Sequence, residues 1–183
     1  MGEKAIGLIE LSSVAAGFLA ADAMLKAANV YLILSRSICS GKYMVLIGGE
    51  VSAVQSAVEA GKAAAGGCLI DDFIIPNVHP DVFLALGRSS IPQVGDALGV
   101  LESFSVASLI EGADAAAKAG NVTLLEIRLA MALGGKAFAT MTGDVASVQS
   151  AIDAGKRKIS ERGMLTNAVV IPRPHPDVYK EVV

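Results

Sequence analysis

The chain of 183 residues is poor in aromatic and charged side chains. It has no tryptophan, only 4% aromatic and 18% charged residues, whereas 53% of its residues are hydrophobic. This apolar content excludes an intrinsically disordered chain, which requires low hydrophobicity and high net charge. Because most of the apolar residues are small and each buries little surface, we expect the protein to bury further surface against copies of itself.

The sequence also lacks basic clusters, a disulfide framework and a clean membrane segment. The net charge is −3, so binding to nucleic acid is not expected. Two cysteines, Cys39 and Cys68, are too few for a disulfide framework and are typical of a reducing cytoplasm. The most apolar stretch, residues 15–34, contains Asp22 and Lys26, which argues against a membrane-spanning helix. Charged residues among the first ten positions likewise argue against a signal peptide.

What the chain does contain is an internal duplication. Residues 5–10 (AIGLIE) recur as residues 97–102 (ALGVLE). The segment 54–57 (VQSA) recurs at 148–151, and 79–82 (HPDV) recurs at 175–178. The offset between copies grows from 92 to 94 to 96 residues, so the second repeat holds two short insertions.

Each repeat has the same pattern of expected elements. In the first repeat, strands are expected at 5–11, 30–35, 42–47 and 69–76, with helices after the first and third strands. One face of the first helix is expected to comprise Val14, Phe18, Ala21, Leu25 and Ala28, and one face of the second Val54, Ala57, Val58 and Gly61. The order βαββαβ is that of a ferredoxin-like domain, so the fold class is α+β. The predicted domains are residues 1–86 and 97–183, joined by a linker at 87–96.

Several repeated motifs resemble those of bacterial microcompartment shell proteins. They are AIGLIE, DAMLKAANV, GGEV and IPRPHPDV, and both repeats match, so the resemblance covers residues 5–183. Tandem-domain members of this family form flat trimers that mimic a hexagonal tile of six domains. The resemblance therefore implies a pseudohexameric homotrimer with no enzymatic activity. It would meet other shell proteins edge to edge in the shell of a cytoplasmic microcompartment.

The resemblance also implies roles for individual positions. The loops at 37–41 and 130–135 would surround the central axis of the tile. Lys26 and Lys118 match lysines at tile edges. Arg173 matches an edge arginine, whereas the first repeat has Asn77 there, so the six edges would not be chemically equal. The predicted pore-loop residues are Ser37, Ile38, Ser40 and Gly41 in the first repeat and Met131, Ala132, Leu133 and Gly134 in the second.

One cysteine in the first of these loops suggests a metal centre. The stretch SICSGK resembles a loop in tandem shell proteins of propanediol-utilization compartments, which hold a [4Fe–4S] cluster there. The family's loop has proline after the cysteine, where this chain has Ser40. Threefold symmetry would bring three Cys39 thiolates together, and thiolates are the ligands that iron–sulfur clusters require. We expect one [4Fe–4S] cluster per trimer, exchanging electrons across the shell with an encapsulated or a cytosolic redox protein.

Three alternatives stay open at this point. Cys39 can be an incidental loop thiol. The trimer can be free of a cluster, with a central pore that passes small metabolites. In a different class, the chain can be a trimeric ferredoxin-like regulator or enzyme that binds a small molecule, which predicts discrete trimers and a ligand cleft lined by charged groups.

Other candidate residues are interpreted as structural. His79 and His175 occupy the same His-Pro-Asp helix start and are predicted to cap it rather than to bind metal. Glu50 and Asp144, each before a helix, are predicted N-terminal caps. Cys68 is predicted to pack in the core.

Overall fold

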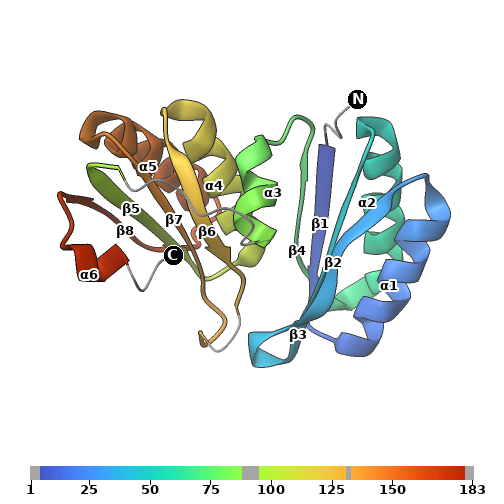
Figure 1. Cartoon of the computed structure of the whole chain (residues 1–183). Coiled ribbons are helices and arrows are strands. Elements are labelled where there is room, and N and C mark those ends of the chain that lie inside the picture. Colours follow the sequence, from blue (N-terminus) through green and yellow to red (C-terminus); the bar gives the residue numbers. More distant parts are fainter. Residues whose placement is uncertain (1–4, 88–94, 131–132, 180–183) are drawn as a thin grey trace. The chain divides into compact units, whose positions relative to one another are not determined.

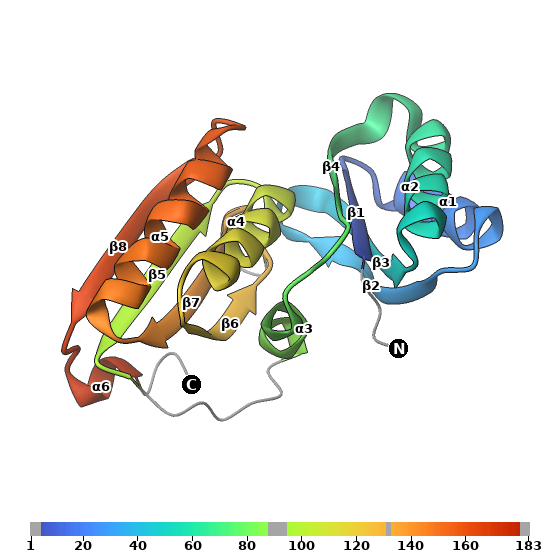
Figure 2. The same cartoon turned by 90° about the horizontal axis from the view of Figure 1, so that it is seen from above.

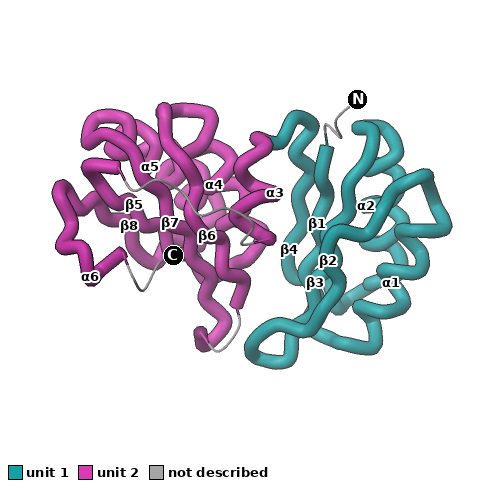
Figure 3. The backbone as a smooth tube through the Cα atoms, viewed as in Figure 1, with its two compact units in different colours: residues 1–78 teal, residues 79–183 magenta. Residues whose placement is uncertain are grey.

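The computed structural model describes residues 5–87, 95–130 and 133–179 (Figure 1). The chain divides into two compact units, residues 1–78 and 79–183 (Figure 3). Each unit is built around one four-stranded antiparallel sheet. Among the described residues, no helix combines the length and the apolar character that crossing a bilayer requires.

The first unit contains the first repeat as far as its last strand. Its sheet has the strand order β2-β3-β1-β4. The elements are β1 (Ala5–Leu11), α1 (Val14–Ala27), β2 (Tyr31–Ile38), the 3₁₀ turn η1 (Cys39–Gly41), β3 (Lys42–Gly49), α2 (Val51–Ala65), the 3₁₀ turn η2 (Gly66–Cys68) and β4 (Leu69–Ile75).

The second unit repeats this architecture. Its sheet has the order β6-β7-β5-β8, and α4 and α5 cover one face of it (Figure 2). The elements are α3 (Pro80–Gly87), β5 (Ala97–Ser103), α4 (Val106–Ala119), β6 (Thr123–Arg128), β7 (Ala137–Gly143), α5 (Val145–Ser160), β8 (Leu165–Pro172) and α6 (Pro176–Tyr179). The predicted α+β class with two tandem ferredoxin-like domains is confirmed. Helix α3, which follows the last strand of the first repeat, packs against β6 and α4 of the second unit.

Small residues let the helices approach each sheet closely. A Cβ atom on Gly7 of β1 would overlap the side chains of Val54 and Val58 on α2. A Cβ atom on the matched Gly99 of β5 would lie 2.9 Å from the Val148 side chain and 3.0 Å from that of Ile152 on α5. The predicted core face of α2 is confirmed, since Val54, Ala57, Val58 and Gly61 are all buried.

The predicted face of α1 is only partly the core face: Ala21 is buried and Ala28 partly buried, but its three large residues are exposed. The buried residues of this helix are Gly17, Ala20, Ala21 and Met24. Val14, Phe18 and Leu25 are exposed although they are larger than the buried glycine and alanines. The Tyr43 ring of β3 lies against Gly17 and fills the space under this helix, so small residues and one flexible methionine occupy the contact. Helical periodicity located an apolar face, but the large residues of that face point away from the core.

The first predicted loop is also shorter than expected. Strand β2 continues to Ile38, because Ser37 pairs with Tyr43 and Ile38 with Lys42 across the hairpin. Ser37 and Ile38 therefore lie in a strand, and the turn between β2 and β3 comprises only Cys39–Gly41.

Candidate functional site

Cys39 begins a tight turn at the end of the β2–β3 hairpin. Its side chain is half-buried. The next two residues both have left-handed backbone conformations, with φ of 67° at Ser40 and 72° at Gly41. Glycine adopts this region freely, whereas an L residue such as serine is strained there. Proline, whose ring holds φ near −65°, cannot occupy position 40 in this turn.

The second repeat has the same turn without a thiol. Gly134 and Gly135, which match Ser40 and Gly41, have φ of 61° and 89°. The backbone N–H of Lys136 donates to the carbonyl of Leu133 at 3.1 Å and closes the turn. Met131 and Ala132, two of the predicted pore-loop residues, lie outside the described part of the chain. The two hairpins thus share a backbone turn and differ in the chemistry that they present.

An ion pair ties the residue after each turn to the central strand of its sheet. Lys42 Nζ lies 2.8 Å from Glu10 Oε1, and Lys136 Nζ lies 2.6 Å from Glu102 Oε1. The Glu10 side chain is only 2% exposed, compared with 29% for Glu102. Because a buried carboxylate is costly without a partner, Lys42 holds the end of the Cys39 turn firmly to β1. The sequence patterns did not predict this pair, although a glutamate and a lysine recur at matched positions of both repeats.

The predicted tile-edge residues lie on the surfaces of their own units. Lys26 Nζ and Lys118 Nζ each lie 2.6 Å from an aspartate one helical turn earlier, Asp22 and Asp114. Arg173 is exposed and has a φ of 48°, and its backbone N–H donates to the Asp96 carbonyl at 2.7 Å. Their role at tile edges stays a prediction.

Both histidines hold a helix start, as expected. His79 Nδ1 accepts a hydrogen bond from the Asp81 N–H at 3.3 Å, and His175 Nδ1 accepts one from the Asp177 N–H at 3.2 Å. Within the described part of one chain, no group of three or more His, Cys, Asp or Glu side chains is arranged to hold a metal ion.

The capping predictions are half right. Asp144 caps α5, where its carboxylate accepts from the Ser147 N–H at 2.9 Å and from the Ser147 hydroxyl at 2.6 Å. The hydroxyl hydrogen bond is the main cause that lowers the pKa of Asp144 below its ordinary value. Glu50 has a similar backbone conformation at the start of α2 but makes no side-chain cap hydrogen bond, so its predicted role is wrong. The longer glutamate side chain does not match the short reach of this cap.

Cys68 lies outside the core cluster of the first unit. It is half-buried in the turn η2, and its carbonyl accepts a hydrogen bond from the Ser12 N–H at 2.8 Å. The core-packing prediction for Cys68 is therefore wrong, because the chain turns one residue before β4 begins.

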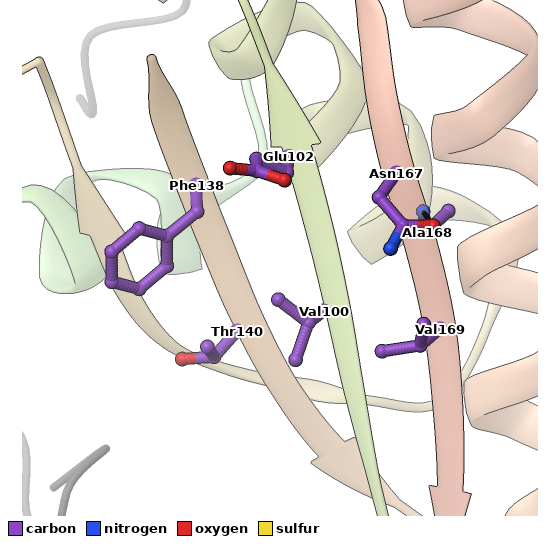
Figure 4. Close-up of a pocket in the computed structure, with 7 residues that line it drawn as sticks. All are labelled: Val100, Glu102, Phe138, Thr140, Asn167, Ala168 and Val169. Carbon is purple, nitrogen blue, oxygen red and sulfur yellow. Dashed lines mark hydrogen bonds between the residues drawn. The ribbon is translucent and has the colours of Figure 1, made fainter. Parts of the chain in front are cut away.

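A shallow hollow of about 340 Å³ lies on the face of the second sheet opposite its helices (Figure 4). Among the described residues that line it, Glu102 alone is charged. The other lining residues are Val100, Phe138, Thr140, Asn167, Ala168 and Val169. The first repeat carries the bulkier Leu8, Leu46 and Phe73, all buried, where the second has Val100, Thr140 and Val169. That difference in side-chain volume was the signal in the sequence that could have located the hollow.

Comparison with known proteins identifies relatives along the whole chain. The BMC domain family matches residues 5–78 and 97–174. The chain is 42% identical over 180 residues to the bacterial microcompartment shell protein PduT of Citrobacter freundii, covering 98% of both chains. It is also 42% identical over 84 residues to the shell protein PduA of the same organism, covering 45% of this chain and 90% of that one. The crystal structure of a microcompartments protein from Desulfitobacterium hafniense DCB is 54% identical, with a TM-score of 0.90 over 98% of this chain and 99% of that one.

Proposed function

Because the chain belongs to the BMC-domain family and is a structural shell protein of a bacterial microcompartment rather than an enzyme, we propose that three copies form one tile that holds a [4Fe–4S] cluster on its axis. The Cys39 thiolates of the three copies are its ligands. The likeness to PduT supports a compartment of the propanediol-utilization type. The observation that carries the cluster proposal is the position of Cys39 at the start of a hairpin turn in one repeat only.

The residues around Cys39 fit such a centre. One chain supplies one thiol, so three chains supply three of the four ligands that a [4Fe–4S] cluster usually has, and an exogenous ligand completes the set. The turn has room for neighbouring copies, because a Cβ atom placed on Gly41 would meet no other atom within 4 Å. Ser40 and Gly41 add little bulk beside the thiol.

The chain's own residues position the thiol. The left-handed pair at Ser40 and Gly41 reverses the chain within one turn. The Lys42–Glu10 ion pair then anchors the turn to the sheet. When bound, the cluster supplies one-electron transfer. In the tile, the anchored hairpins hold the thiols at fixed positions, which keeps the reorganisation on electron transfer small.

Anaerobic reconstitution of the wild-type protein, Cys39→Ser and Cys68→Ser tests the cluster. Wild type and Cys68→Ser are expected to bind one cluster per three chains, measured by iron and sulfide content, visible absorbance and electron paramagnetic resonance. Cys39→Ser is expected to stay colourless. A Cys39→Ser protein with the same cluster spectrum contradicts the proposal.

A tile with an open axial pore is the second candidate. It is favoured by the matched turn of the second repeat, where Gly134 and Gly135 offer no metal ligand. A colourless wild-type trimer that still assembles into sheets would support this pore. Discrete trimers without sheets in electron micrographs would instead contradict both forms of the tile and favour the regulator class.

A further inference from the structure

The first helices of the two repeats are buried to very different extents. Both contain 14 residues and align at an offset of 92, yet α4 has ten buried residues and α1 has four. Phe18 is 64% exposed, whereas the matched Ile110 is fully buried. Val14 and Leu32 are likewise exposed, and the matched Val106 and Leu124 are buried. We call Val14, Phe18, Leu25 and Leu32 the α1–β2 face.

In the second unit, the region that matches this face is packed against α3. Helix α3 lies on β6 and α4 and buries Val82 and Ala85 completely. Just before the helix, the backbone N–H of His79 donates to Asp114 Oδ1 of α4 at 2.7 Å. The other carboxylate oxygen of Asp114 holds Lys118 at 2.6 Å. The HPDV motif at 79–82 therefore packs on α4, the first helix of the second repeat.

The second copy of the motif, residues 175–178, has the same local structure but is not covered. The Asp177 N–H donates to His175 Nδ1 as the Asp81 N–H donates to His79. However, the His175 side chain is 73% exposed, compared with 32% for His79. Val178 is exposed, whereas the matched Val82 is fully buried. The chain thus contains one HPDV motif that packs on a first helix, α4. It also contains a second, exposed motif at 175–178 and a second first helix, α1, that is not covered.

The acceptor on the α1–β2 face is already arranged like its counterpart. Asp22 holds Lys26 at 2.6 Å through Oδ2, just as Asp114 holds Lys118. A docked segment would also leave Lys26 accessible, because Lys118 keeps 40% exposure of its side chain beside the seated α3. Docking and a tile-edge role for Lys26 are therefore compatible.

We propose that the α1–β2 face binds the segment 175–178 of a second copy of this chain, with the His175 backbone N–H of that copy donating to Asp22. Each copy then uses its α1–β2 face to bind one neighbour and its segment 175–178 to bind another, so the contact is head to tail. Such contacts continue until the rotation closes a ring. The inference rests on the proposed function in one respect, namely that the ring closes at three copies.

Two single variants test the contact from its two sides. Phe18→Asp places a charge in the α1–β2 face, and Val178→Asp places one in the segment. Both residues are exposed in the chain, so both variants are expected to fold, which circular dichroism and thermal melting check. By sedimentation velocity and native mass spectrometry, wild type and the conservative Phe18→Leu are expected to be trimers. Each aspartate variant is expected to be a monomer at the same concentration.

Mixing the two aspartate variants gives the sharper result. The Phe18→Asp chain retains an intact segment, and the Val178→Asp chain retains an intact face, so one contact forms and no further contact can follow. The mixture is expected to form dimers and no trimers. Folded aspartate variants that remain trimeric, or a mixture that stays monomeric, would overturn the contact while leaving the shell tile intact. A wild-type protein that forms neither trimers nor sheets would instead overturn the proposed function.

Discussion

Gly17 of α1 lies against the ring of Tyr43 of β3, so close that a Cβ atom on Gly17 would overlap the ring. The Tyr43 hydroxyl lies 2.9 Å from Ser35 Oγ, and its ring centroid lies 5.2 Å from that of Phe18. In the second repeat the matched residues are Leu109 and Ala137, both buried. The large side chain belongs to the strand in the first repeat and to the helix in the second, so the two repeats fill the same space from opposite sides.

This exchange predicts strong coupling between the two positions. Gly17→Leu alone is expected to lower the free energy of unfolding by about 3 kcal/mol or more, because it overfills the core. Tyr43→Ala alone is expected to cost about 3–5 kcal/mol through the cavity that it leaves. The double variant, which copies the second repeat, is expected to be more stable than the sum of the single losses predicts. Denaturant unfolding in a double-mutant cycle measures the difference, and additive losses would contradict the exchange.

The two ion pairs behind the turns are expected to differ in strength. Lys42→Met leaves the buried carboxylate of Glu10 without its partner, so a loss of about 3–5 kcal/mol in the free energy of unfolding is expected. Lys136→Met is the matched control. It is expected to cost about 1 kcal/mol or less, because Glu102 remains partly hydrated. Equal losses in denaturant unfolding would show that burial of the carboxylate is not what distinguishes the pairs.

The left-handed conformation of Ser40 determines which residues the turn accepts. Ser40→Gly is expected to change the free energy of unfolding by less than about 1 kcal/mol, since the relief of strain offsets the added freedom of the unfolded chain. Ser40→Pro is expected to destabilise the protein by more than about 1 kcal/mol, because proline cannot adopt the φ of 67° found there. Thermal melting of both variants measures this, and a Ser40→Pro protein as stable as wild type would contradict the turn geometry.

The cap on α5 is expected to make stability depend on pH. The pKa of Asp144 is lowered in the folded protein by its hydrogen bonds to Ser147, so the unfolded chain binds this proton more readily. The stabilisation is present above the unfolded pKa of about 3.9 and is lost as pH falls through the lower folded value. Asp144→Ala is expected to lower the melting temperature at pH 7, with a difference that shrinks below about pH 4. Glu50→Ala, which removes no cap hydrogen bond, is the control and is expected to show no such pH dependence.

Much of the fold could be predicted because its signals are local in the sequence. The duplication, the order βαββαβ and the buried face of α2 follow from spacing within short windows, and the structure confirms them. The buried face of α1 could not be predicted in this way. Its sequence offers two apolar faces, and only packing on the sheet, where the Tyr43 ring lies against Gly17, decides that Gly17 and Met24 face inward rather than Phe18 and Leu25.

The candidate site shows the same difference between what local sequence predicts and what packing decides. The sequence by itself determined that one thiol lies between the second and third strands of the first repeat, and that the second repeat has none. Only the tertiary structure decided that the turn comprises Cys39–Gly41 and that Glu10 anchors it, because strand pairing and burial depend on residues far apart in the chain. The two HPDV motifs make the same point: they are identical in sequence and in their local hydrogen bonds, yet His79 is seated on α4 and His175 is exposed. The burial of a segment depends on what packs against it, and the segment's own sequence does not specify that.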